Sequence, residues 1–315
     1  MDDKELHVVT GAFSYTGKYI TRRLLRAGVQ VRTLTGHPAR PNEFGKTVDV
    51  RPLSFDDHGA LKASLRGAAV LYNTYWIRFE HRKETFERAV ANTQLLLTAA
   101  REAGVRRVVH VSIANADRRP DLPYYRGKAA IERFLAASST SHAILRPTVI
   151  FGEEDILINN IAWILRRSPV FGVPGDGQYG IRPIFVDDMA QLAVDLGGRA
   201  ENVTIDAVGP ETFTFDEWLR LLAKAVGSRP RLLHLPPSIA LWAARAISVA
   251  VRDVVLTADE VKGLTAGLLT TSTPSVGETR LTDWLSQNAD TVGRRYASEL
   301  ARHYRYPSSS RSPTP

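Results

Sequence analysis

The chain has no cysteine among its 315 residues. Disulfides and thiolate metal sites are therefore excluded, and nothing in the composition indicates an oxidising compartment. The eight histidines show no spacing typical of metal ligands, so we predict no metal site. The N-terminus lacks the basic and apolar regions of a secretory signal. No segment approaches the roughly 18 uncharged apolar residues of a membrane span, so we expect a cytoplasmic protein.

The chain also lacks a run of like charges, although its net charge is +8. Its basic residues are mostly arginines scattered along the sequence, as at 22–23, 106–107 and 166–167, which does not favour a nucleic-acid partner. The apolar segment 236–251 is interrupted by Arg245. We expect this segment to be a buried helix, with peripheral contact to a membrane surface as the less favoured alternative.

Segments rich in β-branched residues alternate with helical patterns through the first half of the chain. The strand-like segments are apolar almost throughout, as expected when helices cover both faces of a sheet. This alternation predicts an α/β fold with a Rossmann-type doubly wound parallel sheet. Strands are expected at 5–10, 29–35, 47–53, 68–75, 105–112 and 141–147, and helices at 16–27, about 84–103 and around 124–128.

The regular alternation ends near residue 150. We therefore assign residues 1–150 to the Rossmann domain and residues 151–305 to a smaller, mostly helical C-terminal lobe that is interleaved with the sheet. Residues 306–315 are polar and rich in proline and serine, which predicts disorder. Asp187 or Asp188 is expected to cap a helix of the lobe.

The junction between the first strand and the first helix is rich in small residues. Gly11, Ser14 and Gly17 stand three residues apart in this strand–turn–helix. Gly11 can make a tight turn and Gly17 lets the helix pack closely, so that N–H groups at the helix N-terminus face a pyrophosphate. Ser14 replaces the usual middle glycine, and its hydroxyl can bond a phosphate oxygen. The cofactor-binding residues expected here are Gly11, Phe13, Ser14, Tyr15, Thr16 and Gly17.

No acidic residue follows the second strand until Glu43. A site for NAD(H) usually has Asp or Glu there, because a carboxylate binds the ribose 2′-hydroxyl. This segment instead offers Arg32, His37 and Arg40, whose side chains can bind a 2′-phosphate. We therefore expect NADP(H) in preference to NAD(H), with surface cations on a loop as the plainer interpretation.

A tyrosine and a lysine, Tyr124 and Lys128, stand four residues apart. On a helix this spacing places both side chains on one face. A nearby ammonium lowers the pKa of a phenol and makes it a better proton donor. Ser112 ends the fifth strand, at the edge where open parallel sheets bind ligands. The aromatic residues within 75–79 either line a substrate pocket or pack against the lobe.

With these motifs in place, the chain resembles the short-chain dehydrogenase/reductase superfamily. It is most similar to the atypical branch that contains NmrA-like proteins and the nucleotide-binding accessory subunit of respiratory complex I. The resemblance covers roughly residues 5–235. It rests on "TGAFSYTGKYI", "ANTQLLLTAAREAGVRRVVHVS", "YYRGKAAIE", "LRPTVIFG" and "PIFVDD", in this order and spacing.

The resemblance implies roles for particular residues. It implies that Ser112 orients a substrate carbonyl, that Tyr124 is the general acid/base, and that Lys128 binds the cofactor ribose and lowers the pKa of the tyrosine. Further positions that it places near the cofactor are Ser54, Phe55, Asn73, Thr74, Pro147 and Thr148, in addition to His37 and Arg40 of the segment after the second strand.

Several positions depart from the family pattern. Ser14 replaces the middle glycine, Ser54 replaces an acid often found near adenine, and Gly36 stands where NADP-binding relatives often have arginine. Ser112 and Tyr124 are only 12 residues apart, which resembles the atypical branch, where catalysis is often absent.

The motifs and the resemblance together favour an NADP(H)-binding oxidoreductase that acts on a small or isoprenoid-like carbonyl or alkene, as a monomer or homodimer. One alternative is a non-catalytic nucleotide-binding protein, either a redox sensor or an accessory subunit of a membrane complex. A weaker alternative is a nucleotide-sugar epimerase or dehydratase.

Overall fold

The computed structural model describes residues 5–304 and divides the chain into two compact units. The first unit consists of residues 1–150, 182–210 and 269–279, and the second unit contains the rest. Residues 182–210 and 269–279 were assigned to the lobe from the sequence, but they belong to the unit that holds the large sheet. The predicted disordered tail, 306–315, lies outside the described residues.

A seven-stranded parallel sheet forms the centre of the first unit, in the order β11-β6-β5-β4-β1-β2-β3. Because β1 lies between β2 and β4, the direction of winding reverses there, and such a reversal opens a ligand crevice at the carboxyl ends of the strands. The six strands predicted from the sequence are confirmed. The strands are β1 (Leu6–Thr10), β2 (Gln30–Thr35), β3 (Val48–Pro52), β4 (Ala68–Asn73), β5 (Arg107–Val111), β6 (Ser141–Pro147) and β11 (Val203–Ala207).

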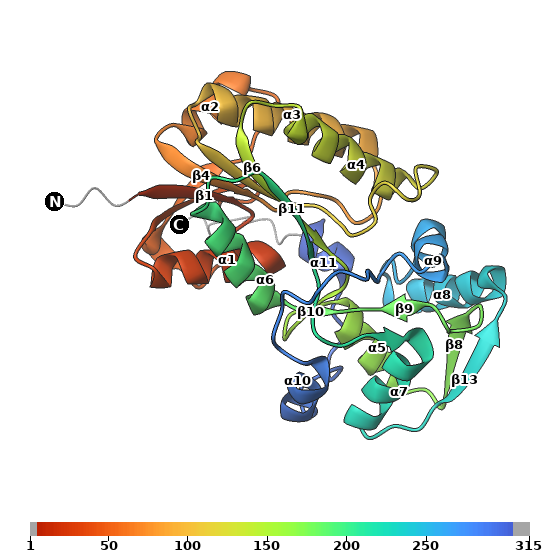
Figure 1. The fold of residues 1–315 in the computed structure, drawn as a ribbon. Coiled ribbons are helices and arrows are strands. Elements are labelled where there is room, and N and C mark those ends of the chain that lie inside the picture. Colours follow the sequence, from red (N-terminus) through yellow and green to blue (C-terminus); the bar gives the residue numbers. More distant parts are fainter. Residues whose placement is uncertain (1–4, 305–315) are drawn as a thin grey trace, which may run out of the picture. The chain divides into compact units, whose positions relative to one another are not determined.

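Helices cover both faces of this sheet, as predicted for a doubly wound fold (Figure 1). The helices α1 (Tyr15–Arg26) and α6 (Val186–Gly197) lie on one face, and α2 (His58–Leu65), α3 (Phe86–Glu102) and α4 (Pro123–Ala136) lie on the other. Successive strand residues point to opposite faces. The α2–α4 face accordingly buries Val8, Leu34, Leu71, Val108 and Ile144, and the opposite face buries Val9, Val109 and Leu145.

The start of α6 differs from the prediction. Asp187 and Asp188 do not cap this helix; they lie in its first turn, and Phe185 occupies the N-cap position. The Asp187 carboxylate accepts two hydrogen bonds from the Arg23 guanidinium of α1, at 2.9 and 2.7 Å. The Asp188 carboxylate accepts hydrogen bonds from the N–H groups of Glu278 and Thr279. These partners are remote in the sequence, so a local pattern could not reveal them.

The second unit combines helices with two small two-stranded sheets. In one sheet, β8 pairs with β13 in parallel, and in the other, β9 pairs with β12 in antiparallel fashion. After β13, the regular elements of the described chain are all helices. The elements of the second unit are α5 (Leu157–Leu165), β8 (Val170–Pro174), β9 (Gly180–Ile181), β12 (Phe213–Thr214), α7 (Phe215–Ala225), β13 (Arg231–Leu235), α8 (Pro237–Val251), α9 (Ala258–Thr265), α10 (Leu281–Asn288) and α11 (Glu299–His303). The remaining elements are the two-residue strands β7 (Ile150–Phe151) and β10 (Ile184–Phe185) and a short 3-10 helix at Gly45–Thr47.

Helix α8 is not the buried helix expected from its composition. Its buried residues are Ala240 and Ala244, whereas Ile239, Trp242 and Val249 are 51%, 69% and 79% exposed. The prediction failed because the helix is apolar around most of its circumference, so hydrophobicity alone could not tell which face packs. No helix within residues 5–304 is both long and apolar enough to cross a membrane.

Arg107, the first residue of β5, is a buried cation that ties the sheet to the connection after α6. Its guanidinium donates hydrogen bonds to the carbonyl oxygens of Leu196 (2.6 Å) and Glu201 (2.9 Å) and to the Ser141 hydroxyl (2.6 Å).

An Arg107→Leu substitution leaves these acceptors without a partner. We expect it to lower the free energy of unfolding by at least about 2 kcal/mol in urea titrations. The control, Arg106→Leu, removes a 70% exposed side chain and should change stability by under about 0.5 kcal/mol; equal losses would contradict this role.

Candidate functional site

The loop between β1 and α1 is built by hydrogen bonds that converge on Gly11. Gly11 has a left-handed backbone, with φ +69°, and its N–H donates to the Leu34 carbonyl at 2.9 Å. The N–H and the hydroxyl of Ser14 both donate to the Gly11 carbonyl, at 2.8 and 2.6 Å. In this structure the Ser14 hydroxyl therefore closes the loop. The Ala12 N–H donates to the Thr33 hydroxyl at 3.0 Å, which fixes the loop to β2.

Gly17 lies where the backbone of α1 meets this turn. A Cβ atom at Gly17 would lie 2.8 Å from the Gly11 carbonyl carbon and closer still to its oxygen, a distance that no side chain tolerates. The first turn of a helix leaves N–H groups without acceptors in the helix, and these groups bind anions such as a pyrophosphate. The close contact holds that turn, with Tyr15 and Thr16, against the end of the sheet. The loop therefore has the tight turn and the close helix packing that its glycines predict.

The side chain of Phe13 is buried in the core beneath the same loop. It is 5% exposed and stacks on Phe44, with ring centroids 6.4 Å apart. Only the backbone of Phe13 is therefore available to a ligand. Its ring anchors the loop to the core under α1.

The predicted 2′-phosphate residues separate into two groups. His37 and Arg40 lie together in the turn after β2, where the His37 N–H donates to the Thr35 hydroxyl and the Arg40 N–H donates to the His37 carbonyl, both at 3.1 Å. Burial, followed by the positive charge of Arg40, lowers the pKa of His37. Arg32 lies within β2 and donates to Asp49 at 2.7 Å and to the Ser64 carbonyl at 3.0 Å. Arg32 is therefore a structural residue, and the expectation that it binds a phosphate is wrong.

The segment after β3 lies beside the same turn. The Leu53 N–H donates to the Thr35 carbonyl at 2.8 Å, which brings Ser54 to the end of β2. The Phe55 ring packs against the Tyr75 ring, with centroids 5.0 Å apart. The two predicted residues of this segment, Ser54 and Phe55, are partly buried.

A polar network joins the ends of β1, β4 and β5. The Asn73 side-chain oxygen accepts hydrogen bonds from the Thr10 hydroxyl (3.2 Å) and the Tyr75 N–H (3.1 Å). The Asn73 amide nitrogen must then be the donor to His110 Nδ1, at 3.0 Å. The Thr74 hydroxyl donates to the Thr10 carbonyl at 2.6 Å. Asn73 and Thr74 are thus held in the crevice region by bonds within the sheet, and their backbones are fixed there.

The sequence analysis missed His110. This residue has no exposed surface, and burial, followed by the positive charge of Lys128, lowers its pKa well below the usual range. The neutral ring accepts from Asn73 through Nδ1, so its proton is on Nε2, which has no hydrogen-bond partner within residues 5–304. A histidine inside the otherwise apolar strand "VRRVVHVS" was the available signal.

Ser112 and Lys128 lie on the α4 side of the sheet, as His110 does. His110 and Ser112 alternate with Val111, so they follow Val108 onto the face that α4 covers. The Ser112 side chain is 3% exposed, and its hydroxyl has no hydrogen-bond partner in the described part of the chain. Lys128 Nζ donates to the Val111 carbonyl at 2.8 Å. The predicted serine and lysine therefore meet at the end of β5.

Burial lowers the pKa of Lys128 to about 7, and the carboxylate of Glu132 only partly opposes the shift. The ammonium also lies 4.6 Å from the centre of the Trp76 ring, where a cation is attracted to the π system. The lysine is consequently only partly charged near neutral pH. Its predicted influence on a neighbouring phenol must then depend on pH in the physiological range.

Tyr124, at the start of α4, sits among aromatic rings. The edge-on partners of its ring are Trp76, Phe86 and Tyr125, at centroid distances of 6.0, 5.8 and 5.6 Å. Gly127 makes room for this cluster, because a Cβ atom there would lie 3.0 Å from the Trp76 ring. Trp76 of the aromatic segment 75–79 therefore packs against α4 of the first unit, so its expected packing against the lobe is not what the structure shows.

The loop after β6 is stabilised by an arginine that was not predicted. The Thr148 hydroxyl, next to the buried Pro147, donates to the Arg182 carbonyl. The Arg182 guanidinium in turn donates to the carbonyls of Gly209 (2.9 Å) and Thr271 (3.2 Å). These bonds hold distant segments of the first unit beside β6, and they engage the hydroxyl of Thr148 within the protein.

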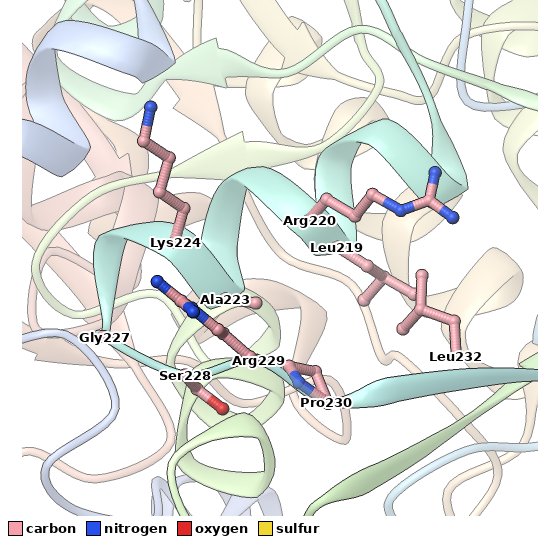
Figure 2. A pocket seen from close by; sticks show the side chains of 9 residues that line it. All are labelled: Leu219, Arg220, Ala223, Lys224, Gly227, Ser228, Arg229, Pro230 and Leu232. Atoms are coloured by element: carbon pink, nitrogen blue, oxygen red, sulfur yellow. The ribbon is translucent and has the colours of Figure 1, made fainter.

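The second unit contains a separate pocket of about 390 Å³ beside α7 and the start of β13. Figure 2 shows three cationic side chains on its lining, Arg220, Lys224 and Arg229, which extend in different directions. Arg220 also lies 3.5 Å from the Asp216 carboxylate. Because the cations do not converge on one point, the pocket lacks the geometry of a specific anion site.

The fold and the loop define the class of this protein: it is a Rossmann-type dinucleotide-binding protein. Residues 11–160 match a protein family described as NAD(P)H-binding. The chain is 28% identical over 243 residues to the mitochondrial NADH dehydrogenase [ubiquinone] 1 alpha subcomplex subunit 9 of Arabidopsis thaliana, covering 74% of this chain and 60% of the relative. It is 28% identical to a ceramide reductase of Caulobacter vibrioides, covering 75% of each.

Solved structures show the same fold. The Citrobacter sp. triphenylmethane reductase complexed with NADP(H) superposes with a TM-score of 0.74 at 18% identity, over 90% of this chain and 99% of that one. The NADPH-dependent quinone oxidoreductase of Escherichia coli gives a TM-score of 0.73 at 20% identity, over 90% and 98%. These structures show that the chain shares their fold.

The contact between Gly17 and Gly11 gives the first prediction for the site. In Gly17→Ala the new methyl group forces α1 away from the turn, so we expect NADPH affinity to fall at least about tenfold in calorimetric titrations. Gly198→Ala is the matched control, because the nearest atom to its Cβ would be 3.7 Å away. Unchanged affinity in Gly17→Ala would show that this loop does not bind the nucleotide.

The buried lysine predicts a pH-dependent stability. Below about pH 7 both the folded and the unfolded chain hold the Lys128 proton, so the full cost of the buried charge is present. Between about pH 7 and pH 10 only the unfolded chain holds it, so stability rises with pH, by up to about 1.4 kcal/mol per pH unit. Urea denaturation of wild type and Lys128→Met should therefore diverge in favour of wild type as the pH rises. Parallel curves would contradict the burial of this amine; Lys224→Met, at an exposed lysine, is the control.

Proposed function

We propose that this protein is an NADP(H)-dependent oxidoreductase that acts on a small or isoprenoid-like carbonyl or alkene. The observation that carries the proposal is the buried Ser112 hydroxyl, which has no hydrogen-bond partner among residues 5–304. A buried hydroxyl without a hydrogen-bond partner destabilises the fold. Because Ser112 lies beside the Lys128 contact, at the edge of the sheet where ligands bind, we expect a bound ligand to accept a hydrogen bond from this hydroxyl. A substrate carbonyl oxygen is such an acceptor.

Each side chain of the site then has a definite task. Ser112 donates its hydroxyl proton in a hydrogen bond that orients and polarises the carbonyl. Tyr124, one helical turn before Lys128, supplies a proton to the developing alkoxide oxygen. The phenol regains its proton from solvent, and Lys128 stabilises the phenolate when the lysine is charged. A bound nicotinamide cofactor would supply the hydride.

The preference for NADP(H) rests on the turn after β2. His37 and Arg40 lie there without an intervening acid, and the chain has no carboxylate at the end of β2 to hold a ribose 2′-hydroxyl. Arg40 is partly buried, so its side chain has fewer conformations to lose on binding a phosphate than a fully exposed arginine has. The related ceramide reductase is consistent with an apolar substrate carbonyl.

A second function, nucleotide binding without catalysis, is favoured by a different observation. Lys128 is already engaged by the Val111 carbonyl and by the Trp76 ring. If this arrangement persists when the nucleotide binds, Lys128 assists neither the ribose nor Tyr124. The similarity to accessory subunits of NADH dehydrogenase supports a sensor or an assembly role on this basis.

The two functions predict different results for one set of variants. The protein is titrated with NADPH and NADH and then assayed for NADPH oxidation with a panel of aldehydes, ketones and quinones. For the oxidoreductase, we expect tighter binding of NADPH and turnover that falls at least about 100-fold in Tyr124→Phe and Ser112→Ala, with the NADPH Kd unchanged. Tyr125→Phe, at the neighbouring position, is the control and should keep its activity.

Other outcomes decide against the oxidoreductase. NADPH binding without turnover on the whole panel would support the non-catalytic function. Turnover that survives Tyr124→Phe would exclude the assigned proton donor. A lower NADH Kd than NADPH Kd, unaffected by Arg40→Ala, would overturn the cofactor preference.

A further inference from the structure

Helix α8 presents an apolar stripe to solvent in the second unit. Ile239, Trp242, Ala246 and Val249 are spaced by three, four and three residues, which places them on one face of the helix. All four are exposed, and Trp242 and Val249 are 69% and 79% exposed. We call this surface the α8 stripe. Single exposed apolar residues are ordinary on a protein surface, but an aligned set that includes a tryptophan marks an interaction site.

The α8 stripe is held in place by the rest of the second unit. The opposite side of the helix buries Ala240 and Ala244, and α8 packs on β8 and β13. The helix ends at Arg252, and the following Asp253 is 5% exposed. The Asp253 carboxylate accepts hydrogen bonds from the N–H groups of Glu299 (2.8 Å) and Leu300 (2.9 Å). The helix is therefore anchored at its C-terminal end with the stripe outward, so the exposure is part of the fold.

The sequence from Trp218 of α7 to Arg252, the C-cap of α8, carries charges of one sign. Acids make up about one residue in ten of the chain, yet residues 218–252 contain none. The same stretch contains six cations: Arg220, Lys224, Arg229, Arg231, Arg245 and Arg252. Two of them, Arg245 and Arg252, belong to α8 and its cap, and both are exposed. The next acid in the sequence, Asp253, is buried and accepts hydrogen bonds within the second unit. Helix α9, which packs against α8, carries two acids, but Asp259 lies 3.6 Å from Lys262 and Glu260 accepts hydrogen bonds from Thr257.

Trp242 and Arg245 form a pair on this surface. The Arg245 guanidinium lies 5.3 Å from the centre of the Trp242 ring. A tryptophan side chain has an apolar body and a polar N–H, which suits the boundary between lipid headgroups and acyl chains. A guanidinium at the same level can bind the phosphate of a headgroup. The pair thus offers one apolar and one cationic group to the same layer.

From these observations we propose that the α8 stripe binds the surface of a bilayer that contains anionic phospholipids, with α8 lying in the plane of the headgroups. The helix has 15 residues, which is too short to span a bilayer but sufficient to lie on one. A second copy of the chain is a poorer occupant, because a symmetric contact through the stripe would bring Arg245 and Arg252 of one copy against the same cations of the other.

Vesicle sedimentation of the full chain tests this proposal. Vesicles of phosphatidylcholine alone and of phosphatidylcholine with phosphatidylglycerol are compared at low and high salt. We expect binding to the anionic vesicles only, weaker at high salt because the surface potential is screened. Trp242→Glu and Val249→Glu should lower the bound fraction at least about tenfold, and Arg245→Gln should lower it less.

The control variant is Val276→Glu, at an apolar residue of the first unit that is 38% exposed. It should sediment like wild type. Thermal unfolding and NADPH titration of every variant establish that the fold and the nucleotide site are intact, so a loss of lipid binding can be assigned to the stripe.

Three results would overturn the proposal. The first is no binding to anionic vesicles by the wild type. The second is equal binding by wild type and Trp242→Glu. The third is a wild type that does not bind the vesicles but forms a concentration-dependent oligomer in solution, which Trp242→Glu abolishes. That result would make the stripe a contact between protein chains.

Discussion

The contact between Gly17 and the Gly11 carbonyl is the constraint on which the nucleotide site depends. It leaves no room for a side chain, so α1 starts directly against the turn that ends β1. The same turn is bonded to β2 through Leu34 and Thr33. The helix N-terminus, the end of β1 and the end of β2 are consequently one rigid assembly. A dinucleotide that binds its N–H groups is thereby placed in register with the residues at the ends of β4 and β5.

A second theme of the structure is the burial of polar groups beside this assembly. His110, Ser112 and Lys128 are each at most 3% exposed on the α4 side of the sheet, and the first two have polar atoms without partners in the described residues. Burial lowers the pKa of both side chains, so the histidine is neutral near neutral pH and the lysine is only partly charged. A buried site with little charge suits an uncharged substrate or the nicotinamide part of a cofactor.

The two units carry different proposed binding surfaces. The first unit contains the nucleotide loop and the predicted site residues, whereas the second unit carries the cationic, acid-free stretch and the α8 stripe. An oxidoreductase that acts on an isoprenoid-like or other apolar substrate gains from attachment to a lipid surface, because such substrates partition into membranes. The proposed membrane contact and the proposed substrate class therefore support each other, although they rest on different residues.

The sequence by itself determined the sheet, the helices on its two faces and the glycine loop. These features follow from periodicity, turn residues and the chain order of a parallel sheet, all of which are local or topological. Only the tertiary structure decided that Arg32 pairs with Asp49 and that Asp187 pairs with Arg23 instead of capping a helix. It also decided that His110 bonds to Asn73 at the end of the sheet and that α8 exposes its tryptophan. Each of these depends on partners far away in the chain or on which side of a segment is covered, and neither is encoded in the spacing of neighbouring residues.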